Sequence, residues 1–142
     1  MNKIIYSFIL LFSISAFAQD YKYGFSRRYP VTFDSKGDYI RGAEEKIEGL
    51  FFFDLGLIDF ELKGKPTEKL DFLKISFDDR HPDLYELATI YSFQSHKGNF
   101  EIKLYQFLDR RIQVFSSYEG KNYLYIIDKA IAEDGTVYAV KT

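Results

Sequence analysis

The chain of 142 residues contains no cysteine and no tryptophan, and it has only three prolines and two histidines. The missing cysteines exclude disulfides, thiol nucleophiles and thiolate ligands for zinc. No apolar run reaches the ~20 residues that an ordinary membrane-spanning helix needs. A charged fraction of 28% and a hydrophobic fraction of 46% are typical of a globular protein and not of a disordered chain.

Short catalytic motifs are also missing. The sequence has no Gly-x-Ser-x-Gly elbow, no Gly-x-Gly-x-x-Gly loop and no Gly-Lys-Ser/Thr phosphate loop. A Ser-His-Asp triad has only His81 and His96 to use, and both lie in expected loops. These absences favour a non-enzymatic protein that carries no cofactor.

The most specific signal is at the start of the sequence. Residues 1–18 combine a positive residue, Lys3, with an apolar stretch and a small-x-small site that ends at Ala18. This layout is typical of a secretory signal peptide, and its junction with Gln19 resembles the cleavage sites of many exported bacterial proteins. We therefore expect an exported protein, periplasmic or extracellular, whose mature chain is 19–142.

The mature chain is mildly acidic. Removal of Lys3 with the signal leaves 18 basic residues against 21 acidic ones, a net charge of 18 − 21 = −3. This balance argues against a general polyanion binder, so no nucleic acid partner is expected.

Period-two alternation dominates the second half of the sequence. Phe100, Ile102 and Leu104, for example, alternate with polar residues, which predicts one apolar and one polar face. Loops of a few residues separate the runs, and such loops connect antiparallel neighbours. The pattern predicts a four-stranded meander at about 84–95, 99–107, 111–118 and 122–128.

The first half is less regular. Strands are predicted at about 47–55, 58–62 and 71–77, with a short helical turn opening at Thr67. Residues 19–40 hold aromatic residues with weak periodicity, so we expect a loosely ordered arm or an edge strand there.

A last strand is expected at 136–140, after the Asp134-Gly135 turn, pairing with residues 126–132. A short helix at 127–133 is the alternative. Together these patterns predict a single small all-β domain over 19–142, an antiparallel up-and-down meander of about seven to nine strands. It is either a barrel or a sandwich.

Tyrosines supply the first candidate site. Many lie on the polar side of predicted strands, where a flat ring with a hydroxyl suits a binding surface. The alternative is that aromatic residues simply favour strands and fill a core that lacks tryptophan. The candidate surface consists of Tyr105, Tyr118, Tyr123 and Tyr125.

Charged residues supply weaker candidates. Asp78, Asp79 and Asp83 share one loop and are a conceivable cation site, although their spacing matches no calcium loop. Asp59 and Glu61 share a strand face, as a glycosidase pair would, or form the wet face of an ordinary strand. The basic pairs at 27–28 and 110–111 lie near aromatic residues and suit acidic ligands.

Three classes of function remain. The leading one is a non-enzymatic exported β-domain that binds a small ligand or a protein partner. Within it, a small barrel with a lipocalin-like cavity would bind an apolar ligand. The other classes are a carboxylate-dependent hydrolase and a structural accessory of the cell envelope.

The exported protein is expected to begin at Gln19, because the apolar stretch ends in a cleavage site after Ala18. N-terminal sequencing or intact mass of the exported fraction checks this, with pyroglutamate allowed at Gln19. Exported protein that retains Met1 contradicts the prediction.

Overall fold

A computed structural model of the chain describes residues 21–54, 56–95, 98–118 and 120–142, so the predicted signal peptide at 1–18 lies outside the described residues. The described ranges contain eleven strands in one antiparallel sheet and no helix, which confirms the all-β prediction. Accordingly, no helix that could cross a membrane is found in them. The strands are β1 (Lys22–Phe33), β2 (Tyr39–Arg41), β3 (Gly49–Asp54), β4 (Leu57–Leu62), β5 (Glu68–Asp71), β6 (Lys74–Phe77), β7 (Tyr85–Ser95), β8 (Gly98–Phe107), β9 (Ile112–Tyr118), β10 (Lys121–Ile131) and β11 (Val137–Ala139).

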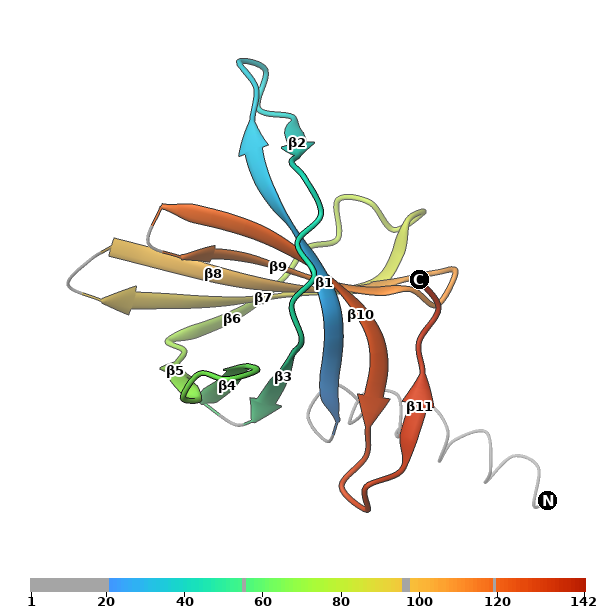
Figure 1. Cartoon of the computed structure of the whole chain (residues 1–142). Helices are drawn as coiled ribbons and strands as arrows, with labels where there is room; N and C mark the ends of the chain where they lie inside the picture. Colours follow the sequence, from blue (N-terminus) through green and yellow to red (C-terminus); the bar gives the residue numbers. More distant parts are fainter. Residues whose placement is uncertain (1–20, 55, 96–97, 119) are drawn as a thin grey trace.

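The sheet curls into a half-barrel (Figure 1). Its main path follows the order β5-β4-β3-β1-β10-β9-β8-β7-β6, so consecutive strands pair from β3 to β5 and again from β6 to β10. β1 lies between β3 and β10 and joins these two meanders. The short strands β2 and β11 pair with β1 and β10 outside this path. The architecture is therefore one curled sheet and not the two facing sheets of a sandwich.

β1 corrects the expectation for residues 19–40. It is neither a loose arm nor an edge strand, because it pairs with β10 on one side and with β3 on the other. Tyr23 and Phe25 in this strand are almost completely buried. Tyr23 and Phe25 pack in the main core, whereas Val31 packs in a second apolar cluster, and a bulge lies between them. A strand buried on both faces and interrupted by a bulge loses the clean alternation that reveals a strand in sequence.

The helical turn expected after Thr67 is wrong, whereas the strand pair expected around the Asp134-Gly135 turn is confirmed. Residues after Thr67 form strand β5 instead of a helical turn, and the strand predicted at 71–77 is confined to β6. Residues 127–131 form the end of β10 and not the alternative helix at 127–133. This end of β10 pairs with β11, as expected if the segment is a strand. Pairing with a neighbouring strand outweighs the weak local preference in each case.

The main core lies on the concave face of the half-barrel. Phe25, Phe51, Phe60 and Tyr125 form a cluster whose ring centroids lie 4.7–6.3 Å apart. Aromatic pairs at such distances contribute about 0.5–1.5 kcal/mol beyond their buried area. These rings supply the large volumes that the chain cannot obtain from tryptophan.

Gly49 allows this cluster to close. A Cβ at this position would lie 2.1 Å from the carbonyl oxygen of Glu61 and 2.4 Å from the ring of Phe25. Both contacts are far below van der Waals distance, so only glycine permits the backbone of β3 to approach the Phe25 ring this closely.

A smaller apolar cluster covers the convex face. Val31, Leu124 and Ile126 are buried there, with Tyr29 and Phe115 packed against them. Tyr123, Tyr125 and Ile127 of β10 alternate with Leu124 and Ile126 and pack with the main core on the concave side. β10 is therefore buried on both faces, which fixes its register from two sides.

Paired bulges occur where β1 crosses β10. The register skips Ser26 in β1 and Asp128 in β10, and the Ser26 hydroxyl donates a hydrogen bond to the Asp128 carboxylate. A bulge adds one residue to a strand, so every side chain after it changes face.

The Ser26 bulge therefore decides which arginine faces inward. Arg28 pairs with Tyr125 and shares the concave face with it, whereas Arg27 pairs with Ile126 and faces the convex side. Without the bulge the two arginines would exchange faces.

The predicted core face of β8 is confirmed, since Phe100, Ile102 and Leu104 are all buried. Ile102→Ala should lower the free energy of unfolding by about 2–5 kcal/mol, because it leaves a cavity in this core. Glu101→Ala, on the opposite face of the same strand, is the control and should change it by less than about 0.5 kcal/mol. Urea denaturation measures both, and equal effects would contradict the register.

Candidate functional site

A cavity of about 310 Å³ opens on the concave face of the half-barrel. We call it the concave cavity. Rings and aliphatic side chains from both meanders form most of its wall, and basic and hydroxyl side chains interrupt them. Its lining consists of Arg28, Phe51, Phe60, Leu62, Lys65, Glu68, Leu70, Phe93, Phe100, Ile102, Ser116, Ser117, Tyr118, Lys121, Tyr123 and Tyr125.

Arg28 is the most constrained polar residue of this cavity. Its Cζ lies 3.9 Å from the centroid of the Tyr123 ring, a cation–π contact. Its Nη1 donates a hydrogen bond to the Tyr125 hydroxyl at 3.2 Å. The side chain is only 13% exposed, so its charge lies in a medium of low dielectric constant.

The segment between β2 and β3 holds Arg28 from the other side. The backbone amides of Arg28 and Glu45 donate to each other's carbonyl oxygens at 2.9 and 2.8 Å. The Arg28 Nε and the Glu45 Oε2 form an ion pair at 3.4 Å. Neither atom has a hydrogen bond within the described part of the chain, so the pair is electrostatic without good hydrogen-bond geometry.

Tyr125 connects Arg28 to the core. Burial raises the pKa of its hydroxyl, and the hydrogen bonds with Arg28 and Ser116 partly oppose this rise. The phenol is therefore neutral at physiological pH and orders the guanidinium as a hydrogen-bond acceptor.

The four predicted tyrosines do not form one exposed patch. Tyr118, Tyr123 and Tyr125 line the concave cavity and pack against the core, and Tyr125 is only 2% exposed. Tyr105 lies on the convex face. The prediction treated all polar-side tyrosines as equivalent, whereas strand alternation and the curl of the sheet separate them.

Tyr105 belongs to an apolar groove of about 380 Å³ on the convex face. Its ring lies 5.3 Å from that of Tyr85 and 6.1 Å from that of Phe107. This convex groove extends to Phe33 and Tyr39 in the β1–β2 hairpin, both more than half exposed. Its wall has few polar groups apart from Lys103, His81 and Gln113.

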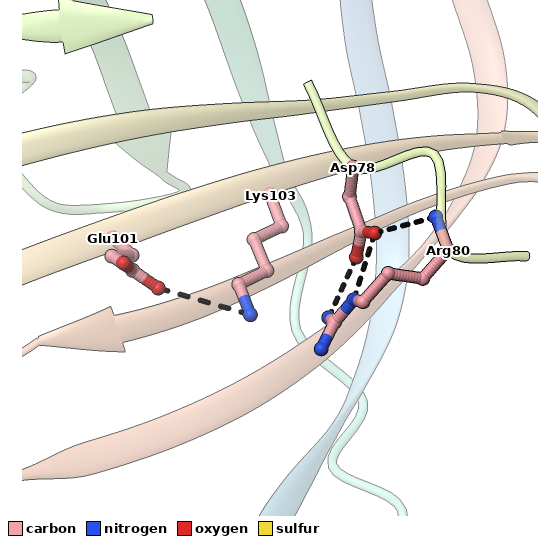
Figure 2. A network of polar contacts seen from close by, with 4 residues as sticks. All are labelled: Asp78, Arg80, Glu101 and Lys103. Carbon is pink, nitrogen blue, oxygen red and sulfur yellow. Dashed lines mark hydrogen bonds and ion pairs between the residues drawn. The ribbon is translucent and has the colours of Figure 1, made fainter. Parts of the chain in front are cut away.

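The candidate cation loop is organised by an ion pair. Arg80 donates from Nε and Nη2 to both oxygens of Asp78, at 2.9 and 2.7 Å, and its backbone amide adds a third bond (Figure 2). These bonds lower the pKa of Asp78 to about 2. Among the described residues no three His, Cys, Asp or Glu side chains come together to hold a metal ion, so Asp78, Asp79 and Asp83 do not form such a group.

Lys103 lies beside this loop, where its Nζ is 3.8 Å from the Glu101 carboxylate (Figure 2). Its charge further lowers the pKa of Asp78. The charges of Asp78 and Glu101 are thus balanced by the charges of Arg80 and Lys103.

The carboxylate pair Asp59 and Glu61 lies on the outer face of β4. The alternate residues Ile58, Phe60 and Leu62 face the core. The pair therefore does not line the concave cavity, and it is placed beside Lys22 in a shallow depression.

The amino-acid pattern indicates Arg28 only in general terms, as one of a basic pair near aromatic residues. Its pairing with aromatic residues was expected for the basic pair at 27–28. The bulge that selects Arg28 over Arg27 and the approach of Glu45 arise from tertiary pairing, which no local pattern reports.

Comparisons of this chain with protein-family models, curated proteins and solved structures find no match.

Burial raises the pKa values of Tyr91 and Tyr105 to about 12. Both phenols stay neutral in the folded protein above pH 10, while they ionise in the unfolded chain. Their stabilising contribution is complete below pH 10 and disappears as the pH rises toward 12. Titration of tyrosinate absorbance should therefore show a late fraction that Tyr105→Phe reduces. A mutant curve that keeps the whole late fraction would contradict the assignment, and protein in urea is the control.

Proposed function

We propose that this protein is a non-enzymatic binding protein that holds a small organic ligand in the concave cavity. One observation carries the proposal: aromatic walls surround an oriented guanidinium in a recess of about 310 Å³. Ligand sites usually have this composition, with a mainly apolar lining and a few placed polar groups. The N-terminal sequence supports export as part of the same proposal.

The position of the cavity also favours ligand binding. It lies between the β3–β5 and β7–β10 parts of a curled sheet, and the half-barrel gives it an open side. The mouths and interiors of small β-barrels are common sites for apolar ligands. The likeness to lipocalin-like binding is one of architecture alone.

The arrangement gives less support to the alternative functions. A carboxylate-dependent hydrolase needs two acids facing one cleft, and Asp59 and Glu61 face away from the concave cavity. Of the described residues that line this cavity, Glu68 is the one acid. A protein partner at the convex groove would contact an apolar surface that has few hydrogen-bonding groups.

The neutral probe N-phenyl-1-naphthylamine tests the proposal, since it has two aromatic rings and no charge. We expect saturable binding with fluorescence enhancement. Leu70→Trp should weaken it by about tenfold or more, because the larger ring fills the cavity that Leu70 lines. Leu84→Trp makes the same change in the convex groove, where Leu84 is exposed, and should leave the affinity unchanged.

Circular dichroism must show that both variants keep the fold. Absence of binding by the wild-type protein contradicts the proposal. Binding that is lost in Leu84→Trp and kept in Leu70→Trp also contradicts it and assigns the site to the convex groove.

A further inference from the structure

We propose that the ligand of the concave cavity is an organic anion, with its carboxylate or sulfonate held by Arg28 and its apolar body packed on the aromatic wall. This inference rests on the proposed function and specifies the ligand class. It follows from three features of the cavity: the balance of its charges, the state of the guanidinium and the distribution of its apolar surface.

The charge of the lining is positive. Among the described residues of the lining, Arg28, Lys65 and Lys121 contribute three cations, and Glu68 contributes one anion. Glu45, which contacts Arg28 from outside the lining, lowers the excess without removing it. An anion gains from this potential in a partly enclosed, low-dielectric space, whereas a cation is repelled.

The guanidinium retains hydrogen-bonding capacity. Contact with the face of Tyr123 uses its π surface and leaves its in-plane N–H groups to bind acceptors. Among the described residues, Nη1 bonds to Tyr125, and the buried Nε faces the Glu45 carboxylate at 3.4 Å without a hydrogen bond. The terminal nitrogen Nη2 donates no hydrogen bond to these residues. Arginine binds planar oxyanions through two parallel N–H groups, a geometry that an incoming carboxylate can adopt and that Glu45, without a hydrogen bond to Nε, does not.

Apart from Ser116 and Ser117, the rest of the lining is aromatic or aliphatic. Phe51, Phe60, Phe93 and Phe100 face the same space as Arg28. Inorganic phosphate or sulfate would leave these rings without a partner. A molecule with one anionic group and an aromatic or aliphatic body satisfies both parts of the wall.

A neighbouring arginine–glutamate pair offers matched controls. Arg27 and Glu44 form an ion pair at 3.3 Å, close to the 3.4 Å of Arg28 and Glu45. The Arg27 side chain is 38% exposed, and neither residue lines the concave cavity. The same substitutions in the two pairs change the net charge of the protein equally and differ only in position.

The experiment compares two probes that differ only by a sulfonate: 8-anilinonaphthalene-1-sulfonate and N-phenyl-1-naphthylamine. We expect the wild-type protein to bind the sulfonate about tenfold more tightly than the neutral probe, as for a hydrogen-bonded charge pair. Arg28→Gln should abolish this preference. Glu45→Gln should increase it by roughly threefold, because a competing carboxylate is removed. Arg27→Gln and Glu44→Gln should leave it unchanged.

Equal affinity of the wild-type protein for the two probes overturns the inference and leaves the proposed function standing. Failure to bind either probe overturns both. If Arg28→Gln does not fold, Glu45→Gln decides, because a purely structural role for the Arg28–Glu45 pair predicts no gain in preference. A gain of the same size in Glu44→Gln also overturns the inference, since it would show a general effect of net charge.

Discussion

The antiparallel pairing of β1 with β10 is the constraint on which the rest of the structure depends. These strands lie about a hundred residues apart in the sequence, and their hydrogen bonds join the β3–β5 meander to the β6–β10 meander. The Ser26–Asp128 hydrogen bond links the two bulged residues within this pairing. Because a shift by one residue reverses the faces of a strand, the same pairing also fixes which side chains enter the concave cavity.

Aromatic packing has two roles in this half-barrel. The chain has neither disulfides nor tryptophan, and phenylalanine and tyrosine rings are the largest of its fully buried side chains. Phe51, Phe60 and Tyr125 belong to this packed cluster and also line the concave cavity. The site is thus built on the packed core of the protein, an arrangement that keeps binding groups preorganised.

Arg27 and Arg28 show how strongly position controls the chemistry of identical side chains. Arg27 lies at the surface with Glu44, where an ion pair contributes little to stability. Arg28 lies against two tyrosines with 13% of its side chain exposed, where the same charge interacts more strongly with its neighbours. The bulge at Ser26 decides which of the two adjacent arginines faces the cavity. The electrostatics of the cavity therefore depend on backbone register as much as on composition.

The sequence by itself determined the strands of the second meander and the core face of β8. Phe100, Ile102 and Leu104 alternate with polar residues, and a half-buried strand requires this local period of two. Only the tertiary structure decided that β1 is central, that residues 68–71 form a strand, and that Tyr105 lies on the face opposite to Tyr125. The reason is that bulges, curl and pairing between distant strands place these residues, and such interactions leave no periodic trace in the chain.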